Sequence, residues 1–140
     1  MILLDTSGLL AAIDASERHH PAAAKALRAA EAPRLLSPFV LAELDYLLGQ
    51  RVGTAAARAL LAEVSGGSYQ LEPFDASDVA KANVHLDRYG DLALGLADAS
   101  ILVLAERHDV SDILTLDERH FRAVRRTAGQ GFRLLPADAA

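Results

Sequence analysis

The chain has 140 residues, 51% of them hydrophobic, and this length predicts a single domain with a substantial core. It contains no cysteine, which excludes a disulfide framework and thiolate metal sites and favours a cytoplasmic location. The formal net charge of -5 excludes a generally basic surface that binds nucleic acid through phosphates alone, and no apolar run is long enough to cross a membrane.

Short apolar runs and helix signals alternate along the chain. A continuous apolar run bounded by polar residues suits a strand that is buried on both faces. Ser37 followed by Pro38 marks one helix start, Thr6 or Ser7 is expected to cap another helix, and residues 75–78 resemble a capping box. In chain order, the predicted elements are strand 2–4, helix 9–13, helix 21–30, strand 34–36, helix 38–50, helix 54–65, strand 69–71, helix 76–89, helix 94–108, strand 112–116, helix 118–124 and strand 132–134.

The alternation of strands with single helices or helix pairs predicts an α/β protein. Consecutive strands that are joined through helices form a parallel sheet by right-handed crossovers, with helices on both faces. We therefore expect a three-layer α/β/α sandwich with a central parallel sheet of about five strands, in one domain over residues 1–140. Residues 136–140 are expected to form a loose tail.

Two aspartates, Asp5 and Asp117, each follow a predicted strand. In an open parallel sheet, the crevice for ligands lies at the carboxyl ends of the strands, beside a change in strand order. The two acids are therefore candidates for a functional site. Each has an equally good alternative explanation, because aspartate between a strand and a helix is a common helix N-cap.

Two further acids, Glu43 and Asp98, fall inside apolar stripes of predicted helices. Glu43 shares a helix face with Val40, Leu44 and Leu47, so its carboxylate is expected to point into the core. Asp98 repeats this pattern in the most hydrophobic helix. An unpaired buried charge is costly, so each acid must pair with a base, accept a proton or bind a cation. Neither helix has a suitably spaced basic residue, which favours a cation over a buried ion pair.

Four carboxylates gathered at one point need positive charge between them. Two like charges about 4 Å apart repel by roughly 4 kcal/mol at an effective dielectric constant of about 20. An all-oxygen site favours Mg²⁺ or Mn²⁺ over zinc, and a pair of such ions suits in-line attack of water on a phosphodiester. The hydroxyls of Thr6, Ser7 and Thr115 are expected to orient the ligands. Asp91 is either a fifth, outer carboxylate or an acid that balances a helix dipole.

Four sequence motifs contain these acids. They are Leu4-Asp5-Thr6-Ser7, Ser37-Pro38 followed by Ala42-Glu43-Leu44, Gly95-Leu96-Ala97-Asp98-Ala99-Ser100-Ile101, and Leu114-Thr115-Leu116-Asp117 followed by His120-Phe121. The ordered set resembles the signature of PIN-domain nucleases, and more narrowly that of VapC-type toxins from bacterial type II toxin-antitoxin pairs. The match covers nearly the whole chain.

This resemblance implies a PIN-like fold in which Asp5, Glu43, Asp98 and Asp117 converge in one pocket at the carboxyl edge of the sheet, where they bind the ions and carry the catalysis. It also implies endoribonuclease activity on RNA that depends on Mg²⁺ or Mn²⁺. A cognate VapB-type antitoxin, whose tail can lie across the active site, and a homodimer are implied as well.

Two other classes of protein fit the sequence less well. A receiver-like module needs a lysine after a late strand, but the only lysines, Lys25 and Lys81, lie in predicted helices. A phosphatase with an aspartyl nucleophile needs a second acid two residues after Asp5, where Ser7 stands.

Several other residues receive structural interpretations. His120 could approach the pocket but is expected to be a partly buried helix residue, and Tyr46 and Tyr89 are expected to anchor a core or an interface rather than stack on bases. Basic residues near the end of the chain are expected to form a solvated helix face. These residues are Arg119, Arg122, Arg125, Arg126 and Arg133.

Overall fold

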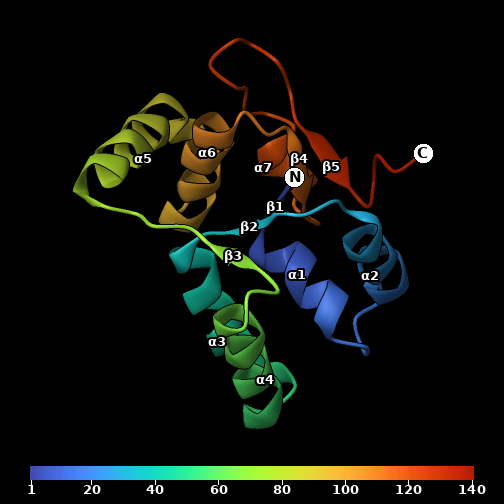
Figure 1. The fold of residues 1–140 in the computed structure, drawn as a ribbon. Coiled ribbons are helices and arrows are strands. Elements are labelled where there is room, and N and C mark those ends of the chain that lie inside the picture. Colours follow the sequence, from blue (N-terminus) through green and yellow to red (C-terminus); the bar gives the residue numbers. More distant parts are fainter.

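Five short strands form the centre of the fold in the computed structural model, which describes all 140 residues (Figure 1). The strands are β1 (Ile2–Leu4), β2 (Arg34–Leu36), β3 (Gln70–Leu71), β4 (Asp112–Leu114) and β5 (Arg133–Leu135). The helices are α1 (Thr6–Ile13), α2 (His20–Ala29), α3 (Pro38–Arg51), α4 (Thr54–Ser65), α5 (Ala76–Arg88), α6 (Leu96–His108) and α7 (Glu118–Phe121), with a short 3₁₀ helix, η1 (Gly90–Leu92), between α5 and α6.

The sheet is parallel throughout, with the strand order β3-β2-β1-β4-β5. Figure 1 shows α5 and α6 on one side of the sheet and α1 and α2 on the other, while α3 and α4 pack together and extend away from it. The predicted α/β/α sandwich with five parallel strands is therefore confirmed. No helix is both long and apolar enough to span a bilayer.

The central strands and one helix make most of the core. All three residues of β1 are buried, and α6 is buried almost all round, from Ala97 to Ala105 apart from Asp98. A helix that is apolar on every face belongs in the interior of a domain. Helix α6 has the most buried residues of any helix, although the prediction that it is the most hydrophobic one is wrong, since α1 is more hydrophobic.

Helix α1 begins three residues earlier than predicted, directly after β1. Its N-cap residue is Asp5 rather than Thr6 or Ser7, and the Asp5 side chain makes no capping hydrogen bond. The early start is possible because Gly8 lies against β4: a Cβ atom there would be 2.3 Å from the carbonyl oxygen of Leu114. The turn signals do not reveal this contact because it depends on a strand more than 100 residues away.

Other element boundaries differ from prediction by a few residues. Helix α6 starts at Leu96 instead of residue 94, because Ala93 adopts a left-handed conformation with φ of 53° and separates it from η1. Helix α7 ends at Phe121, before the predicted end at residue 124, and β4 ends at Leu114. The loose tail stays a prediction, although Asp138 pairs with Arg122.

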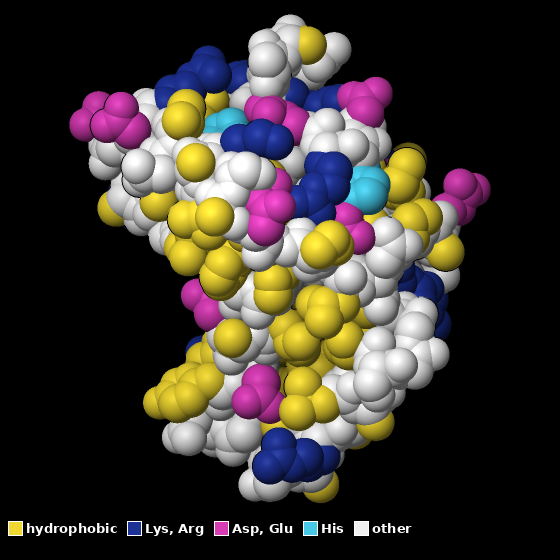
Figure 2. All heavy atoms as spheres, turned by 60° about the vertical axis from the view of Figure 1, so that its left-hand side comes forward, with side chains coloured by type: hydrophobic (Ala, Val, Ile, Leu, Met, Phe, Trp, Pro, Cys, Tyr) yellow, Lys and Arg dark blue, Asp and Glu magenta, His cyan; other side chains and the backbone are white.

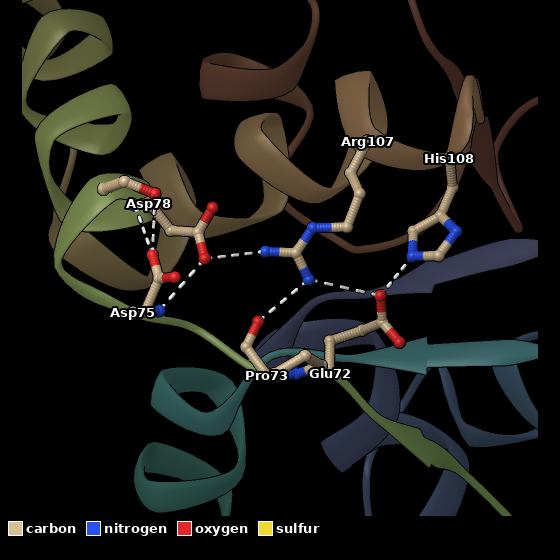
Figure 3. A network of polar contacts seen from close by, with 7 residues as sticks. Glu72, Pro73, Asp75, Asp78, Arg107 and His108 are labelled. Atoms are coloured by element: carbon tan, nitrogen blue, oxygen red, sulfur yellow. Dashed lines mark hydrogen bonds and ion pairs between the residues drawn. The ribbon is translucent and has the colours of Figure 1, made fainter.

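A polar network joins the end of β3 to α5 and α6 (Figure 3). The Arg107 guanidinium lies 2.9 Å from Asp78, donates to the carbonyl oxygen of Pro73 at 2.8 Å and approaches the buried Glu72 at 3.4 Å. His108 contacts the same Glu72 carboxylate. Because a buried carboxylate is tolerated only with partners, this network fixes the C-terminal end of α6 against the edge of the sheet.

Gly8→Ala is expected to destabilise the protein by about 1 to 3 kcal/mol, because the new methyl group overlaps the β4 backbone. Gly49→Ala, in α3, is the matched control, since a Cβ atom added at Gly49 would have no neighbour within 4 Å. It is expected to stabilise by about 0.5 to 1 kcal/mol through helix propensity. Urea unfolding measures both; equal effects would contradict the close approach of α1 and β4.

Candidate active site

The site forms where the strand order reverses: β2 and β3 lie on one side of β1, and β4 and β5 lie on the other. β1 pairs with β2 on one side and with β4 on the other, and the Asp5 backbone N–H donates to the Leu114 carbonyl oxygen at 3.0 Å. Ligand crevices in open parallel sheets lie at such a switch point, at the carboxyl ends of the strands. The end of β1 and the end of β4 therefore form the floor of the candidate site.

A pocket of about 290 Å³ opens at this edge. Its lining includes five carboxylates and a single cation, Arg51. The carboxylates are Asp5, Glu17, Glu43, Asp98 and Asp117. A larger cavity of about 690 Å³ lies beside α2, but hydrophobic residues predominate in its lining and none of the four predicted acids reaches it. The chemistry therefore belongs to the smaller pocket.

Asp5 is the buried centre of the pocket, with 5% of its surface exposed. The hydroxyls of Thr115 and Ser7 donate to the same carboxylate oxygen, at 2.6 and 2.8 Å. Burial raises the pKa of Asp5 to about 6, against the lowering effect of these two hydrogen bonds, and the negative charge of Asp98 adds to the rise. Asp5 does occupy the N-cap position of α1, as the alternative explanation predicted, but its side chain makes no capping hydrogen bond and is bound by the two hydroxyls instead.

The hydroxyls around Asp5 are themselves held by the β4-α7 loop. Ser7 accepts from the backbone N–H of Leu116 at 3.0 Å, and Thr115 accepts from that of Asp117 at 2.9 Å. Each hydroxyl thus has its proton directed at Asp5 and its lone pair satisfied by backbone. This arrangement fixes the orientation of the carboxylate.

Glu43 does not point into the core, so that prediction is wrong. The buried stripe of α3 is Val40, Leu44 and Leu48, and Glu43 lies exposed beside it, at the pocket. Successive helix residues are rotated by about 100°, which places position 43 at the flank of the stripe. The Thr6 hydroxyl donates to the Glu43 carboxylate at 2.8 Å, so Thr6 orients this acid as expected.

Asp98 lies half-buried in the first turn of α6 and accepts from the Gly95 backbone N–H at 3.1 Å. Burial raises its pKa, against this hydrogen bond, and the charges of Asp117 and Glu43 raise it further. Together with its effect on Asp5, this places Asp98 within electrostatic reach of the three other acids. The pocket is therefore one connected acidic centre.

The helices that carry Glu43 and Asp98 are tied to each other. The hydroxyl oxygens of Ser37, which caps α3, and Ser100, in α6, are 2.6 Å apart and fully buried. Ser100 also donates to the carbonyl oxygen of Ala97. A satisfied buried pair of this kind fixes the two helix starts relative to each other.

Asp117 acts as an N-cap and also lines the pocket. Its carboxylate accepts from the backbone N–H of His120 at 3.1 Å and lies 2.7 Å from the Nδ1 atom of the same residue. The hydrogen bond to Asp117 raises the pKa of His120, against a small opposing effect of desolvation. The capping interpretation of Asp117 is thus right, without excluding a role in the pocket. Asp91 is exposed in η1 and does not line the pocket.

The alternative of buried ion pairs finds no support. None of Asp5, Glu43 and Asp98 forms an ion pair with a basic residue. Each acid is turned toward a nearby hydroxyl or backbone donor instead, and no three of them meet closely enough to hold one ion as placed. The oxygen-only donors nonetheless fit the preferences of Mg²⁺ and Mn²⁺.

The fold and the acidic pocket define a PIN-like α/β protein. The family model described as PIN domain matches residues 2–127. Ribonuclease VapC26 from Mycobacterium tuberculosis is 41% identical over 135 residues, which cover 96% of this chain and 100% of that protein. The crystal structure of M. tuberculosis VapC20, described as a toxin that cleaves the sarcin-ricin loop, matches with a TM-score of 0.78 at 24% identity, over 84% of this chain and 90% of that one. The chain therefore belongs to the PIN-domain family, as a nuclease of the VapC type.

Asp5→Asn is expected to raise stability at pH 7.5 in buffer with EDTA by roughly 2 to 3 kcal/mol. The folded-state pKa of Asp5 is about 6, above the ordinary aspartate value of 3.8, because burial disfavours the charged form. The protonated Asp5 therefore contributes its full stability below about pH 4. This contribution is lost as pH rises through about 6 and the buried carboxyl ionises. The wild type and the variant should therefore converge near pH 4 in urea unfolding. A difference that does not change with pH would contradict the buried, proton-binding Asp5, and the exposed Asp87→Asn variant is the control.

Proposed function

We propose that this protein is a Mg²⁺- or Mn²⁺-dependent endoribonuclease that acts as the toxin of a toxin-antitoxin pair. The observation that carries the proposal is that Asp5, Glu43, Asp98 and Asp117 all line one pocket at the switch point of the sheet. Four carboxylates in one pocket, of which only Asp117 has a basic partner in His120, need cations to neutralise them. The 41% sequence identity to Ribonuclease VapC26 supports RNA as the substrate.

The four acids would hold the ions, each in a different way. Asp5 is the most rigid, because Thr115 and Ser7 fix its orientation, and its raised pKa means that a proton competes with a cation below about pH 6. Glu43 reaches the pocket from α3 with its orientation set by Thr6. Asp98 accepts from the Gly95 backbone through one carboxylate oxygen, which leaves its other oxygen for an ion.

Bound divalent ions would supply an activated water and neutralise charge on the phosphate. Asp117 is restrained by His120 at the same helix start, since one of its carboxylate oxygens accepts from the His120 backbone N–H and the other lies 2.7 Å from the His120 Nδ1 atom. His120 thus holds Asp117 at the pocket and limits the directions in which it can turn. The pocket holds no cysteine, and its one serine, Ser7, has its hydroxyl bound between Asp5 and the Leu116 backbone N–H, so water is the nucleophile that the residues favour.

The partners follow from the family. We infer a cognate VapB-type antitoxin whose tail covers the pocket, and a homodimer. Figure 2 shows hydrophobic side chains gathered on the side of the molecule that carries α5 in Figure 1, which supports a protein-protein contact there. Large apolar side chains exposed on the molecule include Tyr46, Leu71, Val79, Val84 and Leu96.

A hairpin with the sarcin-ricin sequence, the target of VapC20, is a rational first substrate.

Purified protein is expected to cleave RNA with Mg²⁺ or Mn²⁺ and not with EDTA. Asp5→Asn and Asp98→Asn should each lower the cleavage rate at least about 100-fold. Loss of a residue that only orients a metal ligand costs up to about 100-fold, and loss of a ligand itself should cost at least as much. The control is Asp87→Asn, an exposed acid on α5 outside the pocket, which should cleave at the wild-type rate. Cleavage is measured with end-labelled RNA and toxicity by induced expression. Wild-type activity of Asp5→Asn in both assays would refute the proposal.

A further inference from the structure

The single cation of the pocket lining has no partner within the protein. Arg51 is exposed at the C-terminal end of α3 and takes part in none of the ion pairs or side-chain hydrogen bonds of the structure. Its positive charge helps to lower the pKa of Asp14, after the stronger effect of the hydrogen bonds from Ser16, but Arg51 makes no ion pair with that acid. The guanidinium donors of Arg51 are therefore free.

Arg51 lies on the same face of α3 as Glu43, one of the predicted metal ligands. Glu43, Leu47 and Arg51 are spaced four residues apart along α3, so they share one face of the helix, and all three line the pocket. Eight residues of α helix separate Glu43 from Arg51 by about 12 Å along the axis. Arg51 is thus at the same groove as the acids but too far along it to serve the reacting phosphate itself.

Most of the other candidate basic residues are engaged elsewhere, and Arg119, which is exposed and unpaired, does not line the pocket. Most of the late arginines form ion pairs: Arg122 with Glu118 and Asp138, Arg126 with Asp109, and Arg133 with Asp112. Arg125 donates to the backbone carbonyl oxygens of Arg122 and Val124. These contacts leave the late cluster as a structural surface rather than a nucleic-acid site.

We propose that Arg51 binds a backbone phosphate of the RNA beside the scissile phosphate. This inference rests on the proposed function. A rim of five carboxylates repels a polyanion, and a free guanidinium at the far end of the pocket offers the one local attraction that the protein itself supplies. Arginine presents a planar fork of donors that matches a phosphate group. Arg51 therefore sets the position of the strand across the pocket.

A purely structural role makes a different prediction. A basic residue in the last turn of a helix stabilises the helix dipole, and Arg51 occupies that position in α3. Such a role would affect the melting temperature of the protein and leave RNA binding unchanged. Binding and stability must therefore be measured in the same variants.

The test compares Arg51→Ala with Arg58→Ala. Arg58 is an exposed, unpaired arginine on α4 that lies outside the pocket, so the two variants lose the same charge. Arg51→Ala is expected to raise KM for a short single-stranded RNA about three- to tenfold with kcat within about twofold of wild type. The slope of log K against log salt should decrease in magnitude by about 0.7, the value for one phosphate contact on a single strand. Arg51→Lys should recover part of the loss, because it keeps the charge without the fork.

Direct binding keeps the inference separate from the proposed activity. In the Asp5→Asn background, fluorescence anisotropy with labelled RNA should show the same weakening and slope change for Arg51→Ala, and none for Arg58→Ala. Equal affinity of the two variants, or a fall in melting temperature with unchanged RNA binding, would overturn the role of Arg51. Failure of the wild type to cleave any RNA would overturn the proposed function, while the anisotropy measurement would still decide the role of Arg51.

Discussion

The pairing of β1 with β4 is the constraint on which the site depends. It places Thr115 beside Asp5, so that a buried carboxylate at one strand end is held by a hydroxyl from the neighbouring strand end at 2.6 Å. The same pairing requires Gly8, because α1 must pass within contact distance of the β4 backbone. Burial then raises the pKa of Asp5 to about 6, so that in the proposed site a proton and a cation would compete for this carboxylate.

The remaining acids line the same pocket as Asp5 from three other elements, and each is oriented by a local donor. Thr6 holds Glu43, the Gly95 backbone holds Asp98, and His120 holds Asp117. The buried contact between Ser37 and Ser100 fixes the spacing of the helices that carry two of these acids. The structure thus presents carboxylates that are close enough to influence one another but separated by their own hydrogen bonds, which is what a site assembled by its cation requires.

The sequence was most informative where local signals and the sheet agree. Asp5 and Asp117 were predicted to share one edge of the sheet because each follows a strand, and both line the same pocket. The Ser37-Pro38 start of α3 followed from capping chemistry. The burial of Glu43 was predicted wrongly, since the edge of an apolar stripe cannot be told from its centre without the neighbouring helix. Arg51 and His120 were not assigned to the site, because their roles depend on which groups surround the folded pocket. The spacing of Arg51 from Glu43 is the only signal that could have found it.

The central claim is that Asp5 and the other acids form one cation site, and calorimetric titration with Mn²⁺ tests it most directly. Titrations in buffers of different ionisation enthalpy give the protons released on binding. With a pKa of about 6, Asp5 should release about half a proton per bound ion at pH 6 and almost none at pH 8, and Asp5→Asn should remove this contribution to the release. Absence of Mn²⁺ binding to the wild type, or binding with no proton release at pH 6, would contradict the account.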